Sequence, residues 1–253
     1  MEERHKESDT PALVKLGLCG FTMAAEDYFR SFPLVEVQQT FYQPPGIETL
    51  ERWRAIAPAG FEFTIKAWQL ITHESRSRTY RRLKRPLTDD EKQDCGAFRW
   101  TPIVEEGWKT TLRCATVLRA TAVLFQCPAS FRPTNENVNR MHHFFRMIGR
   151  VQGLRYLWEP RGVWPHELIS SICSELDLVH VVDPFVNRTV TPDSIYYRLH
   201  GITGSRHVYS DQELRKLLEM IPSTGDPYVL FNNMPRIGDA VRFRKLLSEH
   251  RNG

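Results

Sequence analysis

The chain has 253 residues, of which 41% are hydrophobic and 25% are charged, and its formal net charge is +4. This composition is typical of a globular protein, and so mild a charge permits an anionic partner without requiring one. No apolar run approaches the ~20 residues of a membrane-spanning helix, so we expect no membrane-embedded segment.

The N-terminal residues and the cysteines add further expectations. Residues 1–13 are charged and lack an apolar core, so we expect a flexible tail followed by one domain over residues 14–253. The five cysteines form no Cys-x-x-Cys pair, which excludes a zinc knuckle and a thioredoxin-like motif. A dispersed, odd set is typical of the reducing cytosol, so we expect a cytoplasmic protein without a disulfide-linked partner.

Strand-like and helix-like segments alternate through the first part of the chain. The patterns predict strands over residues 15–21, 34–42 and 61–68, with helices over residues 24–32 and 47–56 between them. The second helix has an apolar stripe of Leu50, Trp53 and Ile56, and Pro58 and Gly60 follow its end.

The periodicity then breaks, because residues 72–104 show no clean helix or strand pattern. This stretch contains a basic cluster, which we call the basic loop: Arg76, Arg78, Arg81, Arg82, Lys84 and Arg85. An insertion of this length is usually functional or mobile.

Alternation resumes over the remaining residues. We expect helices over residues 105–119, 135–151, 165–176 and 239–249, and a further one that opens at a capping box formed by Ser210 and Glu213. The strands between them are predicted over residues 122–126, 154–158, 178–182, 195–199 and 228–231. The link over residues 183–194 is too short, and too interrupted by Pro184 and Pro192, to contain an ordinary helix.

These patterns give eight strands, nearly every one followed by a helix, which implies parallel pairing with right-handed crossovers. Eight such units close naturally into a barrel. We therefore predict an α/β protein, an irregular TIM-like (β/α)8 barrel with a long insertion after the third strand and a short link between the sixth and seventh.

Polar side chains end almost all of these strands. Residues 196–201 show the pattern, because alternation places Arg198 and His200 on one face of the strand. Active sites of such barrels lie at the C-terminal strand ends. We expect catalytic roles for Glu36, Glu159, Asp183 and His200, and substrate-binding roles for Tyr42, Lys66, His73, Gln126, Arg161, Arg198 and Asn232.

More than one interpretation of this polar set stays open. Glu36 and Glu159 suit acid–base chemistry, and Lys66, Arg161 and Arg198 suit an anionic substrate. The same cations would also neutralise the acids in a structural ion-pair network. A divalent metal held by His73 and His200 with Glu36, Glu159 or Asp183 is an alternative that is not favoured, because the nearby cations would repel it, and no metal ligand is assigned. No cofactor follows from the sequence.

Three local features also bear on the site. The basic loop is expected over the same end of the barrel, where it would either stay solvated or grip nucleic-acid phosphates. Cys127 is not assigned as a nucleophile because strand alternation turns it away from the site. His180 is expected to face outward from its strand and to pack in the core.

The polar strand ends also resemble those of a known family, the YecE-like family or domain of unknown function 72. The matching stretches are residues 35–42, 63–66, 71–73, 125–128, 158–161, 182–183, 197–201 and 231–233. The amino-acid sequences of residues 125–131 and 158–161 are most similar to the archaeal-type branch. Gln38 stands where many members carry Asn, and Gly162 where many bacterial members carry His. The resemblance implies a TIM-like barrel and carries no established activity.

The function must therefore come from the site. The first hypothesis is a hydrolase, nuclease- or phosphoesterase-like, that acts on a phosphate-containing or nucleic-acid substrate by carboxylate acid–base catalysis. The alternative is a non-catalytic module that binds an anionic small molecule or nucleic acid in the barrel mouth.

Overall fold

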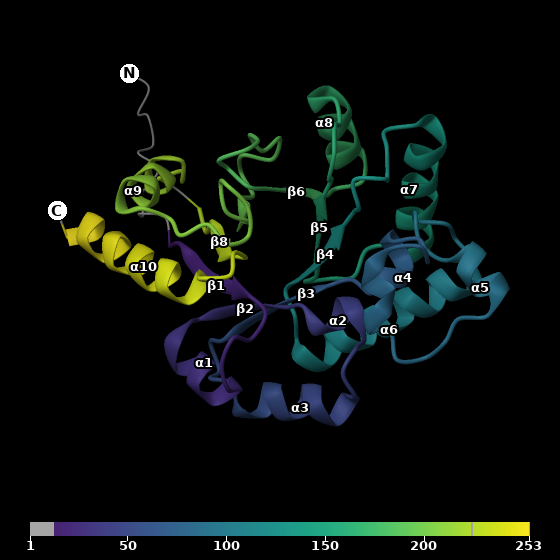
Figure 1. Cartoon of the computed structure of the whole chain (residues 1–253), viewed down its shortest axis with the longest axis horizontal. Coiled ribbons are helices and arrows are strands. Elements are labelled where there is room, and N and C mark those ends of the chain that lie inside the picture. Colours follow the sequence, from purple (N-terminus) through teal and green to yellow (C-terminus); the bar gives the residue numbers. More distant parts are fainter. Residues whose placement is uncertain (1–12, 224, 253) are drawn as a thin grey trace, which may run out of the picture.

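The structure is a computed structural model that describes residues 13–223 and 225–252, so the predicted tail lies almost wholly outside the described residues (Figure 1). Eight parallel strands close into a barrel in sequence order, as the alternation predicted. Their bounds are β1 Lys15–Cys19, β2 Leu34–Val37, β3 Glu62–Lys66, β4 Ala122–Gln126, β5 Arg155–Glu159, β6 Val179–Val182, β7 Tyr196–Leu199 and β8 Tyr228–Phe231.

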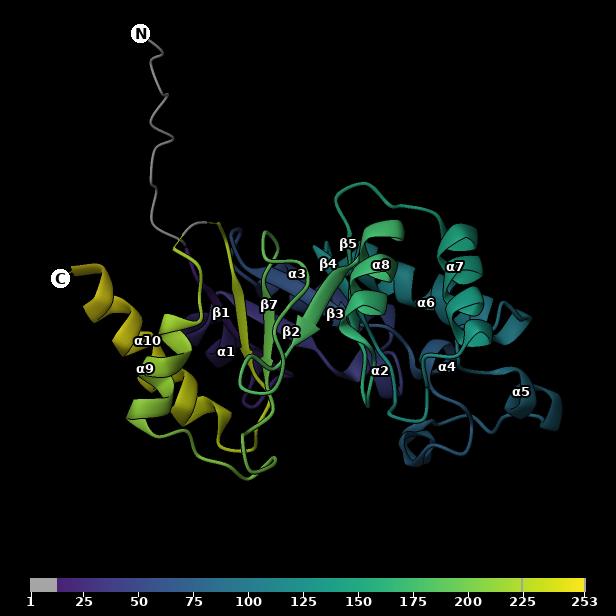
Figure 2. The same cartoon turned by 90° about the horizontal axis from the view of Figure 1, so that it is seen from above.

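Helices follow most strands and cover the outside of the barrel (Figures 1 and 2). They are α1 Ala25–Ser31, α2 Gln39–Tyr42, α3 Ile47–Ile56, α4 Gln69–Thr72, the 3-10 helix η1 Arg78–Arg82, α5 Asp89–Asp94, α6 Pro102–Leu118, α7 Asn135–Ile148, α8 His166–Glu175, α9 Asp211–Glu219 and α10 Arg236–Asn252. In Figure 2, α9 and α10 lie beside β1, whereas α6, α7 and α8 lie beside β4 and β5.

Strand alternation divides the core into two clusters. Side chains such as Leu34, Leu124 and Leu157 fill the inside of the barrel, and residues one position along pack outward against the helices. Gly17 faces inward on β1, where a Cβ atom would lie 2.5 Å from the carbonyl oxygen of Leu34. The barrel is therefore a packed core rather than a pore.

The interior alternation places polar side chains at both ends of the barrel. On β7 the inward series runs from Tyr196 through Arg198 to His200, with Tyr197 and Leu199 in the outer cluster. The predicted division of this strand into two faces is confirmed.

The predicted second strand was too long. β2 ends at Val37, and Gln39–Tyr42 form the one-turn helix α2 instead of extended chain. The hydroxyl of Thr40 donates to the carbonyl oxygens of Val37 and Lys66, which holds this turn against the end of β3. A side-chain hydrogen bond of this kind competes with continued pairing.

The insertion after β3 has more structure than its pattern indicated. It contains α4, η1 and α5, and α5 begins at a capping box formed by Thr88 and Glu91. The predicted capping box of Ser210 and Glu213 opens α9. No helix forms over residues 183–194, all of which the structure describes, so the short link is also confirmed.

Helix hydrophobicity and the cysteines bear on two general expectations. None of the helices in this part of the chain is long and apolar enough to cross a membrane. The cysteines, all of which the structure describes, are buried free thiols. Burial raises the pKa of the Cys127 thiol to about 12, and Cys127 accepts from the Trp158 indole in the outer cluster, away from the mouth.

Candidate functional site

Arg198 is the centre of the polar cluster at the C-terminal end of the barrel. Its side chain is fully buried, and its Nη2 donates to Glu36 Oε1 at 2.9 Å. Its Nη1 donates to Glu159 Oε2. The two acids lie on β2 and β5, so one guanidinium on β7 connects three strands across the mouth.

Glu36 lies at the bottom of this cluster and is fully buried. Besides Arg198, it accepts from the Tyr196 hydroxyl at 2.9 Å and from the Gln38 amide. A carboxylate so enclosed cannot exchange protons with a bound substrate. The geometry therefore does not favour the predicted acid–base role of Glu36 and gives it a positioning role instead.

Arg198 is enclosed in the same way. It has no exposed surface, and both terminal nitrogens of its guanidinium group are bonded to carboxylates. A ligand would have to displace Glu36 or Glu159 to reach it. Here the ion-pair interpretation describes the residue better than direct substrate contact does.

Glu159 and His200 form a second layer that is closer to solvent. Glu159 Oε1 lies 3.0 Å from His200 Nε2 and 2.7 Å from Arg161 Nη2. Burial would raise the pKa of Glu159, but Arg198, the His200 hydrogen bond and Arg161 together hold it well below its usual range. Glu159 is therefore an anion at neutral pH and is an acceptor rather than an acid.

His200 is a neutral imidazole in a defined orientation. Burial lowers the pKa of His200, although the hydrogen bond to Glu159 opposes the shift. Since Glu159 can only accept, we assign the ring proton to Nε2, which leaves the Nδ1 lone pair to accept from Asn232 Nδ2 at 3.0 Å. Arg161 Nη2 can only donate, so with this tautomer it faces the Nδ1 lone pair at 3.2 Å and lies 2.7 Å from the protonated Nε2 without a hydrogen bond to it.

Asp183 does not direct its carboxylate to a substrate. Its oxygens accept from the backbone N–H groups of His200, at 2.8 Å, and of Phe185, at 3.1 Å. The next residue after His200 is Gly201, with φ of 92°, where a Cβ atom would lie 2.2 Å from the oxygen of Gly204. Asp183 and Gly201 thus position His200, so the geometry does not favour a direct catalytic role for Asp183.

Lys66 and Gln126 complete the mouth on β3 and β4. Gln126 Oε1 lies 3.5 Å from Arg198 Nη1. Lys66 is 5% exposed and has neither an ion pair nor a side-chain hydrogen bond with any described residue; its Nζ lies 3.6 Å from the centroid of the Phe41 ring. His73 packs edge-on against the same ring, and burial and the charge of Lys66 lower the pKa of His73 to about 3.

A cavity of about 210 Å³ opens beside the His200 ring, between β5, β6 and the link to β7. Its lining includes Glu159, Arg161, His166, His180, Asp183, Arg188 and His200. His180 is 3% exposed; its Nδ1 accepts from the Val190 N–H, and its Nε2 has no hydrogen-bond partner among the described residues. The expectation that His180 packs in the core is confirmed, whereas no pattern in the sequence indicated that it borders a cavity at the site.

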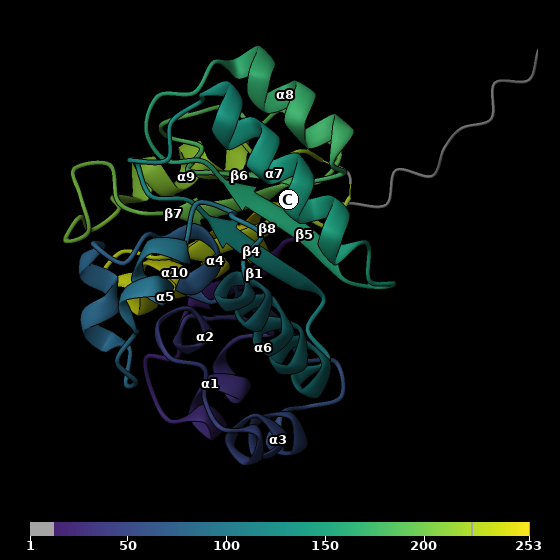
Figure 3. The ribbon, with the colours of Figure 1, turned by 90° about the vertical axis from the view of Figure 1, so that its right-hand side faces the viewer.

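The basic loop packs on the β2 and β3 side of the mouth. Figure 3 shows α4 and α5 at the same end of the barrel as the loop that follows β7. Arg82 lies over the Tyr42 ring at 4.4 Å, and the Lys84 N–H donates to Gln43. Arg76 pairs with Glu74, and Arg85 with Glu91 and Glu106. Arg78 and Arg81 are exposed.

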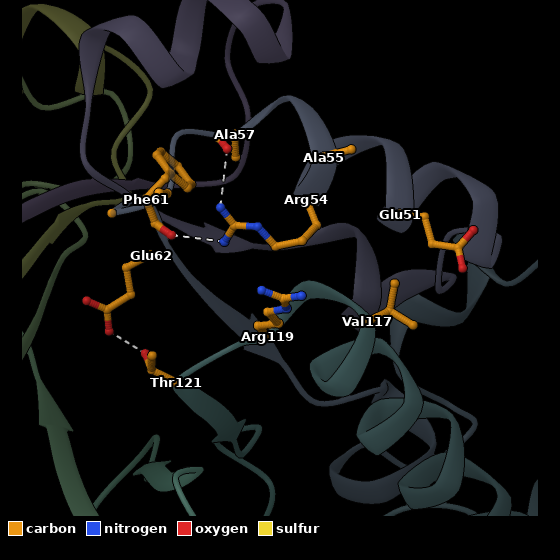
Figure 4. A pocket seen from close by; sticks show the side chains of 11 residues that line it. Glu51, Arg54, Ala55, Ala57, Phe61, Glu62, Val117, Arg119 and Thr121 are labelled. Carbon is orange, nitrogen blue, oxygen red and sulfur yellow. Dashed lines mark hydrogen bonds between the residues drawn. The ribbon is translucent and has the colours of Figure 1, made fainter.

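A larger cavity, about 790 Å³, lies at the opposite end of the barrel near the starts of β3 and β4 (Figure 4). Arg54 and Arg119 face each other there. Arg54 donates to the carbonyl oxygens of Ala57 and Phe61, and so binds the end of α3. This Arg54 contact is structural, because lone carbonyls at a helix end need donors.

The next feature is the arrangement of potential metal ligands in the described part of the chain. Within residues 13–223 and 225–252, no three His, Cys, Asp or Glu side chains converge as a metal-binding group. The acids at the mouth contact Arg198 and Arg161 instead.

Three comparisons place the chain among known proteins. It is 25% identical, over 88% of its length and 84% of the relative, to UPF0759 protein YunF of Bacillus subtilis (strain 168). A DUF72 family protein from Enterococcus faecalis V583 matches in structure with a TM-score of 0.68 at 22% identity, over 94% of this chain and 98% of the other.

The fold extends beyond these relatives. A xylose isomerase domain containing protein from Salmonella typhimurium LT2 matches with a TM-score of 0.56 at 12% identity, over 93% and 95% of the two chains. At this identity the match shows a shared barrel fold alone. The model of the protein family of unknown function DUF72 matches residues 23–252, and the chain belongs to that family.

Proposed function

We propose that the cavity beside His200 binds a phosphate-containing substrate and that the protein hydrolyses a phosphate ester there. The observation that carries the proposal is the placement of His200. A carboxylate orients this neutral imidazole, a guanidinium lies beside it, and it borders a cavity at the C-terminal end of the barrel.

The cavity lining favours a ligand rich in hydrogen-bond acceptors. Arg161 and Arg188 supply guanidinium donors, and His180, whose Nδ1 accepts, carries its proton on Nε2, which has no partner among the described residues. The carboxylates of Glu159 and Asp183 are already occupied by internal donors. A phosphoryl group fits this set, since planar guanidinium groups bind phosphate oxygens in pairs.

His200 would act as the proton carrier. A water molecule would replace Asn232 at Nδ1 and attack phosphorus, while Nδ1 takes the water proton. The P–O ester bond breaks on the opposite side of phosphorus, the leaving oxygen takes a proton from solvent, and the imidazolium returns its proton to solvent. Glu159 stabilises the imidazolium that forms, and Arg161 stabilises the charge that develops on the phosphoryl oxygens.

Assays with p-nitrophenyl phosphate, bis-p-nitrophenyl phosphate and short DNA and RNA strands test the proposal. The substitution His200→Gln should lower kcat/KM by about 10²–10⁴-fold, the usual contribution of one acid–base group. The matched control is His142→Gln, because His142 lies on α7, where it pairs with Glu175 away from the mouth. Equal turnover in both variants would end the assignment.

The pH profile supplies a second test. A base works in its neutral form, and the pKa of His200 is lowered by burial. Activity should therefore persist below the ordinary histidine value of about 6.5 and fall only at lower pH.

A binding module is the second candidate. It is favoured by the number of internal partners of Glu159, since Arg198, Arg161 and His200 already form a closed network around it. In that case p-nitrophenyl phosphate would bind without turnover, and Arg161→Gln would abolish its binding.

A further inference from the structure

The cavity beside His200 has a buried donor that faces it from β6. His180 is 3% exposed and borders this cavity of about 210 Å³. Its Nδ1 accepts from the Val190 N–H at 3.2 Å, so the ring proton is on Nε2, which has no hydrogen-bond partner among the described residues. Because the Nδ1 edge of the ring faces backbone, the ring presents Nε2 to the cavity. A buried donor without an acceptor is costly, which indicates a ligand that accepts from it.

The N-terminus of α8 borders the same cavity. Trp164, His166 and Ile169, at or next to its first turn, belong to the lining. The first backbone bond of the helix runs from the Ile169 N–H to the Pro165 carbonyl oxygen at 3.0 Å, and Pro165 contributes no side-chain cap. The N–H groups of residues 166–168 therefore have no partner among the described residues. Free amides at the positive end of a helix dipole favour an anion.

The charged side chains of the lining also favour an anion. Arg188 is exposed and has neither an ion pair nor a hydrogen bond with any described residue. Arg161 borders the cavity next to His200. The two carboxylates of the lining, Glu159 and Asp183, already accept from internal donors. Unused donors therefore face the cavity from α8, β6 and the link to β7.

We propose that these donors form a subsite for a terminal phosphoryl group, so that the cavity takes phosphomonoesters rather than phosphodiesters. We call it the His180 subsite; it consists of His180 Nε2, the amides of residues 166–168 and the Arg188 guanidinium. The inference rests on the proposed phosphate chemistry and specifies its substrate class. A monoester has three non-bridging oxygens and up to two negative charges, whereas a diester has two such oxygens and one charge. Only the monoester can meet Arg161 and the His180 subsite together and still direct its ester oxygen to the opening.

The size of the cavity supports the same substrate class. Pockets that enclose drug-sized ligands are about 300–1,000 Å³. This cavity, at about 210 Å³, has room for a phosphoryl group and little more. An internal phosphodiester of a polynucleotide carries chain on both sides of phosphorus and would need two exits, whereas the leaving group of a monoester needs one.

Binding of phosphate compounds that are not turned over tests the inference separately from hydrolysis. Isothermal titration calorimetry of the full chain at pH 8 compares inorganic phosphate, mainly a dianion at this pH, with dimethyl phosphate, a diester monoanion. Inorganic phosphate should bind at least tenfold more tightly. Absence of phosphate binding, or dimethyl phosphate binding as tightly as inorganic phosphate, would overturn the inference.

Two substitutions of His180 separate its Nε2 donor from its packing. His180→Asn retains an acceptor for the Val190 N–H but has no donor at the position of Nε2, and it should weaken phosphate binding at least tenfold. His180→Gln carries an amide donor that reaches this position, and it should bind phosphate within about threefold of the wild type. Thermal unfolding shows whether each variant is folded. Equal phosphate affinity of the two folded variants would contradict a role for Nε2.

A substitution at the start of α8 tests the subsite even if the His180 variants do not fold. Pro165 is exposed, and Pro165→Asp places a favoured N-cap carboxylate on the free amides. This variant should keep its thermal stability and bind phosphate at least tenfold more weakly. The matched control Thr134→Asp adds the same charge at the N-cap of α7, outside the cavity lining, and should change phosphate binding less than threefold. Equal losses in both variants would count against the subsite.

Turnover of p-nitrophenyl phosphate and bis-p-nitrophenyl phosphate separates this inference from the proposed hydrolysis. If neither ester is hydrolysed, but Pro165→Asp and His180→Asn weaken phosphate binding as expected, hydrolysis fails and the His180 subsite stands. If the diester is hydrolysed with a kcat/KM equal to or above that of the monoester, hydrolysis stands and the inferred substrate class is wrong.

Discussion

The two ends of the barrel contain similar side chains but use them differently. At the N-terminal end, Glu62 accepts from Lys15, Thr121 and the Tyr228 hydroxyl, and Arg155 lies 3.9 Å from the same carboxylate. At the C-terminal end, Arg198 contacts two buried acids, while Lys66 has no anionic contact among the described residues.

The contrast separates stability from function. The lysine at the N-terminal end is satisfied by its neighbours and stabilises the fold, as expected of that face of a barrel. At the C-terminal end, burial and the charge of Arg198 disfavour the charged form of Lys66. Proteins retain such local strain where it serves binding or catalysis.

The largest effect should come from breaking the central ion pairs. Arg198→Met leaves Glu36 and Glu159 buried without their shared cation, which should lower the free energy of unfolding by about 3–5 kcal/mol. Arg155→Met at the other end removes only a partly exposed contact and should cost no more than about 1 kcal/mol. Urea unfolding at pH 7 measures both; equal losses would show that the two ends do not differ.

The two lysines should respond with opposite signs. At pH 7, Lys66→Met should raise the free energy of unfolding by about 1–2 kcal/mol, because it removes a buried amine that has no ion pair among the described residues. Lys15→Met should lower it by about 1 kcal/mol, because Glu62 and Tyr228 lose a donor.

The gain from Lys66→Met should also depend on pH. The folded-state pKa of Lys66 is lowered to about 7, so the unfolded chain holds the proton more tightly between that value and about 10.4. The wild-type protein therefore becomes more stable as the pH rises through this range. The advantage of the Met variant should be largest below pH 7 and should shrink above it; an advantage independent of pH would argue against the shift.

The smallest effect on stability is expected in the basic loop. Replacement of Arg78, Arg81 and Arg82 by Ser should change the free energy of unfolding by no more than ~0.5 kcal/mol per site, because all three are exposed. If the substrate is a polynucleotide, the triple variant should bind DNA or RNA more weakly. The slope of log K against log salt concentration should become shallower by about one unit for each lost phosphate contact. Unaltered binding would restrict the site to small substrates.

Strand alternation was enough to predict the barrel and the end at which polar residues gather. Glu36, Lys66, Glu159, Arg198 and His200 were all placed at the mouth because period-two patterning survives in short buried strands. The same alternation could have identified Tyr196, which lies two residues before Arg198 and donates to Glu36.

The partners within the mouth could not be predicted from the sequence. Arg198 lies 162 residues from Glu36 along the chain, and their contact depends on how the closed barrel aligns β2 with β7. The role of Gln38 depends on the turn that ends β2, which a strand pattern does not reveal. The cavity beside His180 depends on the path of residues 183–194, which show neither a helical nor a strand-like hydrophobic periodicity.

The two ends of the barrel should shift the pKa values of their lysines in opposite directions, down for Lys66, which has no ion pair among the described residues, and up for Lys15. NMR titration of lysine side chains labelled with ¹³C at the ε position measures this directly, with Lys66→Met and Lys15→Met used to assign the signals. Lys66 should titrate near pH 7 and Lys15 above the ordinary value of about 10.4. A Lys66 signal that titrates together with the exposed lysines would contradict the account.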